Sequence, residues 1–385
     1  MKITKVETLC LTRLHERERQ WFTLKYRTMK ADCAIVIIST DEGIQGIGEA
    51  CAYGVPTLIK EWANFLAPSL IGHDPRKPEI VPHPTGLNRS YDTAVGGIDS
   101  ALWDLKGKIE GKRVSELLGG SAAATEVPMY ASGGCRFDWR TNPNQLIEEV
   151  LGYIEAGFKA TKVRMGMEWS WDGVTIDRYL GLMAELMQAA DGRIQVMVDG
   201  NKRLAFDEAL VITKGLDELG LSWFEEPLPQ EDIDGYARLN AAVEMPITGG
   251  ESLTTLGQFR PYFEKNAYAI VQPDAGVCGI SELVRIAEMA DHYNVILNPH
   301  NWHNGLMTMA NAHFVAATSN STMLEVCQLQ GPLQWEILAE KPVMQDGNLR
   351  LPEKAGLGVE LAEGLLDKFP YIEGHYAIEI QRAYA

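Results

Sequence analysis

The chain has 385 residues, of which 46% are hydrophobic and 23% charged, a composition typical of a soluble globular protein built as one large barrel or two domains. Its formal net charge of −17 argues against nucleic acid or an anionic membrane as a partner, since both bind basic surfaces. No apolar run approaches the roughly 20 residues of a membrane-spanning helix, and no signal-peptide pattern follows Met1, so we expect a cytoplasmic protein.

The first part of the chain has the pattern of an antiparallel meander followed by helices. Between its first two strands lies a polar and aromatic stretch, residues 15–27, that lacks clean periodicity. We expect a mobile loop there, which is either a solvated connection or a lid. The expected elements are strands at 2–10, 33–39 and 45–48 and helices at 57–70 and 93–110.

From Val127 onward, strand and helix patterns alternate. Eight such units over roughly 200 residues favour a closed parallel β/α barrel. An open doubly wound sheet is the alternative, but no glycine-rich dinucleotide motif follows the first of these strands. The expected strands are 127–131, 160–164, 194–198, 221–224, 246–250, 268–273, 294–299 and 322–326, with helical patterns at 144–156, 177–190, 206–219, 280–292 and 307–317.

The chain therefore divides into three predicted parts. Residues 1–124 form an N-terminal α+β domain, and residues 125–345 form the barrel. Residues 346–385 contain a short strand pattern and are expected to return and pack on the N-terminal meander. The six cysteines are scattered without the spacing of a metal site, so we expect reduced thiols.

Three consecutive strand candidates of the barrel lead into an acid. Asp199, Glu225 and Glu251 are separated by 26 residues each, about the length of one βα unit. A single acid at a strand end is usually a helix N-cap or a surface residue. Three at equal spacing converge at the mouth of a barrel, where they would repel one another unless a cation neutralised them. Carboxylates without histidine or cysteine favour Mg²⁺.

The next two strands lead into Asp274 and His300, again 26 residues apart. An aspartate that accepts from one imidazole nitrogen fixes the tautomer and raises the basicity of the other nitrogen. We therefore predict an Asp274–His300 dyad that acts as a general base. His303 is the competing candidate, interpreted as a loop-stabilising residue or a contact to the far end of the substrate.

Lys162 and Arg164 are two residues apart on one predicted strand, so both face the mouth. A lysine there could act as a base if neighbouring positive charge lowers its pKa, whereas an arginine is a poor base. Arg164 is therefore predicted to be an electrostatic or substrate-binding group. The alternative for the pair is a structural ion pair with the carboxylates.

These motifs together resemble the enolase superfamily, specifically its mandelate racemase subgroup. The resemblance covers nearly the whole chain and implies a modified (β/α)7β barrel with an N-terminal capping domain, completed by the C-terminal segment. Two loops of the cap, near 15–27 and 50–56, would close over the mouth. The motifs that carry it are the segment 91–108, Lys162-Val-Arg164, Val198-Asp-Gly-Asn201, Phe224-Glu-Glu-Pro227, Gly250-Glu251, Gln272-Pro-Asp274, Pro299-His300 and Leu324-Glu325.

The resemblance also implies a reaction. The proton α to a substrate carboxylate would be removed while Mg²⁺, held by Asp199, Glu225 and Glu251, stabilises the enediolate. Glu325 would hydrogen-bond the second carboxylate oxygen. Many relatives carry a lysine base at the position of Arg164, so the arginine here argues against two-base racemisation.

We therefore expect a dehydratase of a sugar acid, an aldonate or aldarate, that yields a 2-keto-3-deoxy acid. The alternatives are a racemase, epimerase or lactone cycloisomerase with the same enolate chemistry, and a non-catalytic sugar-acid binder. The family also suggests a homo-oligomer, a dimer or an octamer. Expected contacts to the small-molecule carboxylate substrate are Asn201, Lys202, Asn298, Asn301, His303, Arg17, Arg19, Trp21 and Tyr53.

Overall fold

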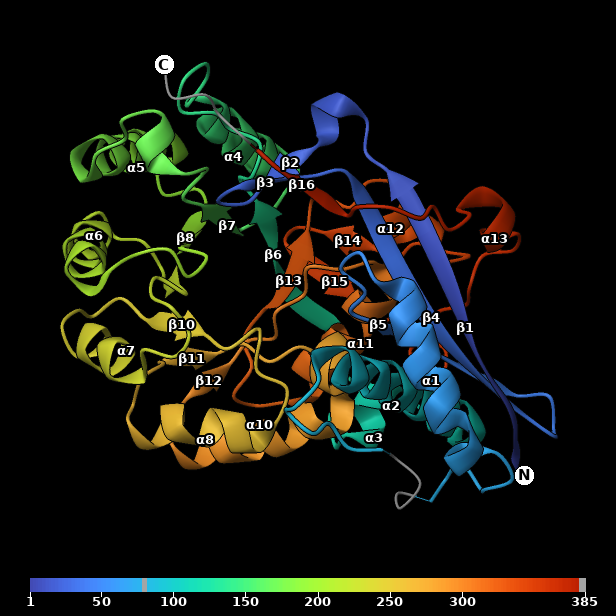
Figure 1. Cartoon of the computed structure of the whole chain (residues 1–385). Helices are drawn as coiled ribbons and strands as arrows, with labels where there is room; N and C mark the ends of the chain where they lie inside the picture. The colour runs from blue at the N-terminus through green and yellow to red at the C-terminus, as the bar shows by residue number, and fades with distance from the viewer. Residues whose placement is uncertain (78–81, 381–385) are drawn as a thin grey trace.

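The computed structural model describes residues 1–77 and 82–380, which form a cap of strands and helices beside a barrel (Figure 1). The cap contains the predicted antiparallel meander, in the order β1-β4-β5. Two helices pack on one face of this sheet against Val36 and Ile38. The bounds are β1 (Ile3–Leu14), β4 (Lys30–Thr40), β5 (Gln45–Ala50), α1 (Pro56–Leu70) and α2 (Arg89–Glu110).

Strand β4 is buried on both faces, which explains its nearly continuous apolar sequence. Val36 and Ile38 contact the helices, whereas Cys33 and Ile35, which alternate with them, belong to the large core shared with the barrel. The cap sheet is thus held between its own helices and the rest of the molecule.

The barrel has the eight predicted parallel strands, and each begins and ends within a few residues of its expected place. The strands run in chain order from β6 to β12, and β13 returns to pair with β6. Their bounds are β6 (Glu126–Gly133), β7 (Ala160–Arg164), β8 (Gln195–Asp199), β9 (Phe224–Glu225), β10 (Ile247–Gly249), β11 (Ile270–Val271), β12 (Ile296–Leu297) and β13 (Leu324–Cys327).

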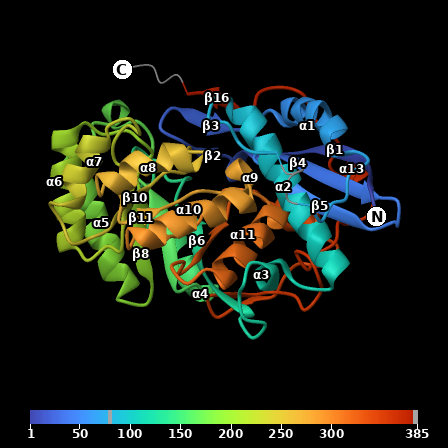
Figure 2. The same ribbon diagram turned by 90° about the horizontal axis from the view of Figure 1, so that it is seen from below.

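Helices cover the outside of the barrel, as both views show (Figures 1 and 2). In the described part of the chain, the last barrel strand is followed by two four-residue helices, α12 and α13 (Leu365–Lys368), and by no longer helix, which gives the (β/α)7β form. The bounds are α4 (Gln145–Glu155), α5 (Ile176–Ala190), α6 (Phe206–Glu218), α7 (Ile233–Asn240), α8 (Leu256–Glu264), α9 (Ala275–Cys278), α10 (Ile280–His292), α11 (Gly305–Ala317) and α12 (Leu333–Glu336), besides α3 (Val114–Leu117), which precedes β6.

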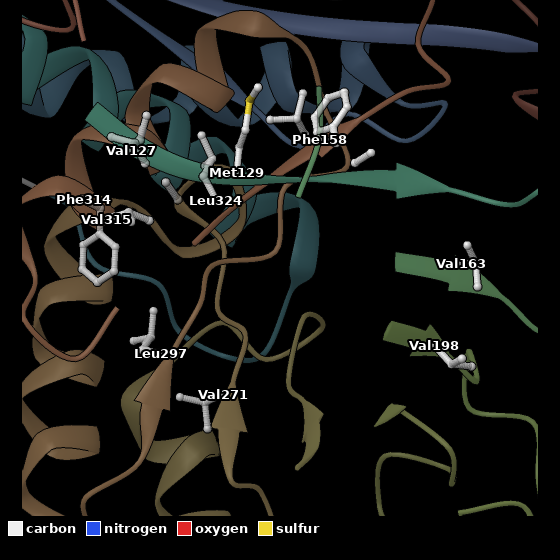
Figure 3. Packing of buried hydrophobic residues seen from close by; sticks show 14 of the residues in the cluster. Val127, Met129, Phe158, Val163, Val198, Val271, Leu297, Phe314, Val315 and Leu324 are labelled. Atoms are coloured by element: carbon white, nitrogen blue, oxygen red, sulfur yellow. The ribbon is translucent and has the colours of Figure 1, made fainter. Parts of the chain in front are cut away.

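Buried apolar side chains form two layers around the barrel wall. Val163, Val198 and Leu297 belong to the layer between strands and helices, shown in Figure 3. A second cluster contains Tyr130 and Met197, which alternate along their strands with the outward-facing residues and therefore fill the barrel interior. This apolar interior supports the polar residues at the mouth.

Two parts of the chain differ from expectation. Residues 15–27 are not wholly irregular: the 3-10 helix η1 (Arg17–Arg19), β2 (Trp21–Phe22) and β3 (Tyr26–Thr28) lie there, and β3 pairs with β16 (Ala377–Glu379). On one side, β3 forms its main-chain hydrogen bonds with a strand about 350 residues away, which local periodicity cannot reveal.

The second difference concerns the boundary at residue 345. Strands β14 (Met344–Gln345) and β15 (Asn348–Arg350) form a hairpin that extends the barrel sheet beside β6, so that boundary divides a hairpin. Beyond it the chain reaches the cap, where the short helix α13 (Leu365–Lys368) comes first, Pro370 then bridges to Leu11, and β16 joins β3.

Cap and barrel approach closely through α2. A Cβ atom at Gly96 would lie 3.0 Å from the carbonyl oxygen of Ala275, the first residue of α9. Figure 2 shows α2 beside α9, the segment that follows Asp274. Glycine in a helix costs about 1 kcal/mol, and here it permits this contact. In the described residues, no helix is long and apolar enough to cross a membrane, and all six cysteines are free.

Candidate active site

The polar residues of the mouth come from the last positions of consecutive strands. Arg164 pairs with Asp199 across β7 and β8, and Asp199 pairs with Glu225 across β8 and β9. Glu251 follows β10 by two residues. Every second side chain of a strand points into the barrel. Along β7 these are Ala160 at the base, Lys162 in the middle and Arg164 at the mouth.

Each of the three predicted metal-binding carboxylates is turned to a cation of the chain. Lys162 Nζ lies 2.6 Å from Glu225 Oε1, and Arg164 Nε lies 2.9 Å from Asp199 Oδ2. Lys202 Nζ lies 3.7 Å from Glu251 Oε1. Burial raises the pKa of Glu225, and although Lys162 opposes this the value rises to about 7. Burial alone would lower the pKa of Lys162, but Glu225 and Glu325 outweigh it and raise that pKa well above its usual range.

The donor set fits a hard divalent cation. All three groups are carboxylates on adjacent strands, and Glu225, fully buried, also accepts from Gln272 Nε2 at 2.5 Å. In the described residues these carboxylates do not lie as close together as Asp274, His300 and His303, whose potential ligand atoms are within 4.8 Å of one another. The residues that could hold Mg²⁺ are thus present, and each is neutralised here by a lysine or arginine.

The predicted dyad is formed. His300 Nδ1 lies 2.8 Å from Asp274 Oδ2, and His300 Nε2 lies 3.3 Å from Glu251 Oε2. Burial alone would lower the pKa of His300, but Glu251, Glu325 and Asp274 raise it to about 9. The pKa of Asp274 is lowered, because its two histidines outweigh the effect of burial.

A second histidine shares the same aspartate. His303 Nε2 lies 3.1 Å from Asp274 Oδ2, the oxygen that also faces His300. Burial alone would lower the pKa of His303, but the neighbouring Cys51 and Asp274 raise it well above its usual range. The centroid of the Tyr53 ring lies 5.1 Å from that of the His303 ring. His303 was predicted as a substrate contact or a loop residue. Its link to Asp274 was not predicted, although a position three residues after His300 makes it possible.

Glu325 is held at the mouth from β13. Its Oε2 accepts from the Asn301 backbone N–H at 2.7 Å, and its Oε1 lies 3.0 Å from Lys162 Nζ. Lys162, His300 and this hydrogen bond outweigh burial, so the pKa of Glu325 is lowered. A lowered pKa favours the ionised form of Glu325, and its hydrogen bond to a substrate carboxylate stays a prediction.

Two asparagines predicted to contact substrate have their side chains engaged within the protein. Asn301 Nδ2 donates to Thr308 Oγ1 and to the Glu325 carbonyl. Asn298 Oδ1 accepts from the backbone N–H groups of Thr322 and Met323, which bridges β12 to the segment before β13. Both are fully buried, so they position the barrel wall and Glu325 rather than offering free groups to a ligand.

Arg164 is packed between two indole rings. Its guanidinium lies 4.7 Å from the Trp302 ring centroid and 5.8 Å from that of Trp21, and the two indoles meet edge to face. Trp21 belongs to β2, so the cap reaches the barrel mouth here. Each such contact contributes about 0.5–2 kcal/mol, depending on how far the cation is removed from water. Trp302 was not predicted, but it lies inside the motif that ends at His303.

Of the other residues predicted to contact substrate, some lie beside the site and two lie on the exposed helix η1. Lys202 Nζ donates to Ser252 Oγ at 2.6 Å and lies 3.1 Å from Glu226 Oε2. Asn201 has the left-handed φ of 52° just after Asp199. Tyr53 is 36% exposed beside His303. Arg17 and Arg19 are exposed on η1, with no contact to the other site residues among those described.

Comparison with known proteins agrees with this arrangement. The model of the enolase C-terminal domain-like family matches residues 145–365, and that of the mandelate racemase / muconate lactonizing enzyme N-terminal domain matches residues 10–119. The chain therefore belongs to the enolase superfamily, in its mandelate racemase subgroup, and it is an enzyme with a capped, TIM-like barrel.

Curated relatives span most of the chain. An arabinonate dehydratase of Saccharolobus solfataricus is 30% identical, with 86% of this chain and 89% of the relative covered. A D-galactarolactone cycloisomerase of Agrobacterium fabrum is also 30% identical, over 96% of this chain and 99% of the relative. A D-galactonate dehydratase of Ralstonia nicotianae is 30% identical, over 95% and 94%.

Solved structures show the same likeness. The 3,6-anhydro-D-galactonate cycloisomerase of Zobellia galactanivorans has a TM-score of 0.82 at 30% identity, covering 96% of this chain and 99% of that one. An enolase superfamily member from a Polaromonas species has a TM-score of 0.85 at 30% identity, covering 97% and 99%. The dehydratases among these relatives are hydro-lyases, whereas the cycloisomerases are not.

Proposed function

We propose that this enzyme is a Mg²⁺-dependent hydro-lyase that dehydrates a sugar acid, an aldonate or aldarate, to a 2-keto-3-deoxy acid. The observation that carries the proposal is the asymmetry of the mouth. One side presents the His300–Asp274 dyad, and β7 presents Arg164, whose guanidinium is paired with Asp199 and packed on Trp302. A permanently charged arginine cannot accept a proton from carbon, so a single base remains for the α-proton.

Mg²⁺ held by Asp199, Glu225 and Glu251 would supply positive charge to the substrate carboxylate and so make its α-proton acidic enough to remove. Neutralising Glu251 removes the largest carboxylate contribution to the raised pKa of His300. The imidazole then becomes available as a neutral base at Nε2, while Asp274 continues to hold Nδ1.

Each residue then has one task. His300 Nε2 takes the α-proton, and the electron pair of the C–H bond passes toward the carboxylate. Collapse of that pair breaks the β C–O bond, and the same imidazolium returns its proton to the departing oxygen, which leaves as water. The resulting enol tautomerises to the keto acid. Lys162, held between Glu225 and Glu325, offers its ammonium group to the negative charge that develops on the carboxylate.

A lactone cycloisomerase is the second candidate, and the similarity to D-galactarolactone and 3,6-anhydro-D-galactonate cycloisomerases favours it over a racemase. That reaction also needs one base and one enolate. It differs in the group expelled, which is an internal ester or ether oxygen rather than a free hydroxyl.

The test is a library of aldonates, aldarates, their lactones and anhydro sugar acids, incubated with enzyme and Mg²⁺ in D₂O. A 2-keto-3-deoxy acid formed from an open-chain acid supports the dehydratase. Turnover of lactones or anhydro acids alone supports the cycloisomerase. Ligand-induced stabilisation with neither product nor α-deuteration would leave only a sugar-acid binder.

The expected partners remain predictions. A small-molecule carboxylate suits the lysines and arginine of the mouth, and the net charge of −17 disfavours nucleic acid and membranes. A homo-oligomer, dimer or octamer, is testable by light scattering coupled to size-exclusion chromatography. The cytoplasmic location is testable by fractionating cells that express the full chain.

A further inference from the structure

We infer that Asp274, His300 and His303 form a second, inhibitory metal site that takes a borderline ion such as Zn²⁺. The three residues are fully or almost fully buried, and their possible ligand atoms lie within 4.8 Å of one another. This group is chemically unlike the carboxylate trio proposed for Mg²⁺. Two imidazoles and one carboxylate are a donor set that Zn²⁺ uses commonly and Mg²⁺ avoids.

The spacing suits a tetrahedral ion. Asp274 Oδ2 lies 2.8 Å from His300 Nδ1 and 3.1 Å from His303 Nε2. Bonds of about 2.0–2.2 Å in a tetrahedral arrangement separate neighbouring ligands by roughly 3.4 Å. To reach that separation, Asp274 Oδ2 would move roughly 0.6 Å from His300 Nδ1 and roughly 0.3 Å from His303 Nε2. The two nitrogens lie within 4.8 Å of each other, and water can complete the coordination.

Every ligand also has an outer partner that would hold it in the required state. When His300 binds through Nδ1 its proton is on Nε2, which lies 3.3 Å from Glu251 Oε2. When His303 binds through Nε2 its proton is on Nδ1, and Cys51 is the residue besides Asp274 that interacts with this imidazole. Such partners fix the tautomer of metal-binding histidines.

The aspartate is oriented in the same way. Its Oδ1 accepts from the Gly276 backbone N–H at 2.9 Å and from Asn311 Nδ2 at 3.3 Å. Those two bonds turn Oδ2 toward the imidazoles. Asp274, Gly276 and Asn311 lie in the barrel, whereas Cys51 directly follows β5 of the cap, so the complete site exists only while the two parts are in contact.

Occupation of this site would stop the proposed reaction. The ion would occupy His300 Nδ1 and Asp274 Oδ2, the two atoms that orient the base and stabilise its cation. Saturating Mg²⁺ would not relieve the inhibition, because a hard ion competes poorly for imidazole. Binding of Zn²⁺ is independent of the proposed reaction, so it can be tested without a substrate.

The full-length protein is first stripped of bound metal and then supplied with excess Mg²⁺. Zn²⁺ is titrated into this sample and its binding is measured by isothermal titration calorimetry. We expect one equivalent to bind. His303→Gln keeps a donor for Asp274 but removes a ligand, so its affinity should fall by more than the roughly 10–100-fold that loss of an outer partner causes. His292→Gln, on the exposed side of α10, is the matched control and should bind like the wild type.

Cys51→Ala is a second variant that leaves all three ligands in place, and it should weaken Zn²⁺ by about 10–100-fold. Co²⁺ gives an independent reading: the wild type should show the intense visible absorption of a four-coordinate ion, and His303→Gln should lose it. Unchanged Zn²⁺ affinity in folded His303→Gln, or a purely six-coordinate Co²⁺ spectrum in the wild type, would overturn the inference. Failure of the dehydratase assay would not affect it.

Discussion

Asp274 has more partners than a simple dyad requires. Its two oxygens are shared by His300, His303, Asn311 and the Gly276 backbone N–H, and all of these groups are buried. A carboxylate held by four partners keeps one orientation, which in turn fixes the imidazole that faces the mouth. The orientation of His300 is thus set by Asp274 and by the groups that hold this carboxylate.

The base assignment is tested by His300→Asn. The side chain remains polar but cannot take a proton, so turnover should fall at least about 100-fold. Mg²⁺ affinity, measured by calorimetry, should stay within about threefold of the wild type, since Asp199, Glu225 and Glu251 are intact. Asp274→Asn should also lose activity, because it removes the acceptor at His300 Nδ1. Full activity in His300→Asn would contradict the assignment.

Arg164→Lys tests why the mouth has a single base. A lysine at this position could lose its proton once bound Mg²⁺ neutralises Asp199, and it would then act on the face opposite His300. We expect lower dehydratase activity, because a lysine lacks the planar guanidinium group that can form two parallel hydrogen bonds to a carboxylate and that packs on Trp302. We also expect α-deuteration in D₂O with inversion, followed by NMR. Dehydration at the wild-type rate with no exchange would show that Arg164 does not decide the outcome.

At the scale of elements, the loops after β8 and β9 continue the sheet beyond its strands. Gly200 N–H donates to the Glu225 carbonyl and Lys202 N–H donates to the Glu226 carbonyl, each at 2.7 Å. This course requires positive φ at Asn201, Lys202 and Glu226, of 52°, 62° and 39°. Such conformations are strained for residues other than glycine, and here they hold two predicted metal ligands in place.

Asn201 separates backbone geometry from substrate contact. Asn201→Val forces a β-branched residue into the left-handed region, so we expect a loss of about 1–3 kcal/mol in unfolding free energy and weaker Mg²⁺ binding, because the Asn201 N–H holds Asp199 Oδ1 at 2.7 Å. Asn201→Gly removes the same side chain without strain and should keep both, as urea denaturation and calorimetry can show. Equal loss of substrate affinity in the two variants would instead support the predicted substrate contact.

The same loops show what the sequence could predict. Strand-end acids recur once per βα unit because strands and helices have fixed lengths, so their meeting at one mouth followed from spacing. The hydrogen bonds of Asn298 and Asn301 could not be predicted from spacing. Both side chains bind backbone groups in the segment 320–325, which no local pattern identifies. The short strand β3 was missed for the same reason, since its partner β16 lies near the end of the chain.

At the scale of the whole molecule, the mouth is completed by the cap. Trp21 packs beside Arg164, and Cys51 interacts with His303. Glu49 of β5 accepts from Asn304 Nδ2 at 2.8 Å and from the Met307 N–H at 3.0 Å, at the start of α11. These contacts place cap residues against the segment that follows His300. The structure therefore couples the stability of the cap–barrel contact to the geometry of the site.

Acid sensitivity of the fold should arise from buried histidines outside the Asp274–His300 dyad. His313 of α11 is fully buried, and its Nδ1 accepts from the Ser115 N–H at 3.3 Å, which joins α11 to α3. Burial lowers the pKa of His313 to about 4, and burial likewise lowers that of His15 to about 4. A neutral histidine in the folded state is protonated more easily once unfolded, so stability is fully present above pH 6.5 and is lost as the pH falls toward 4.

For His313 alone the unfolding free energy should fall by about 2 kcal/mol between pH 6.5 and pH 5, because each pH unit below the unfolded pKa costs about 1.4 kcal/mol. His313→Gln keeps an acceptor for Ser115 but cannot be protonated, so its unfolding free energy, from urea titrations, should change less between pH 7.5 and pH 5 than that of the wild type. His292→Gln, exposed on α10, should reproduce the wild-type slope. Equal slopes in all three proteins would mean that His313 does not carry this dependence, and that the contact of α11 with α3 tolerates a charge inside it.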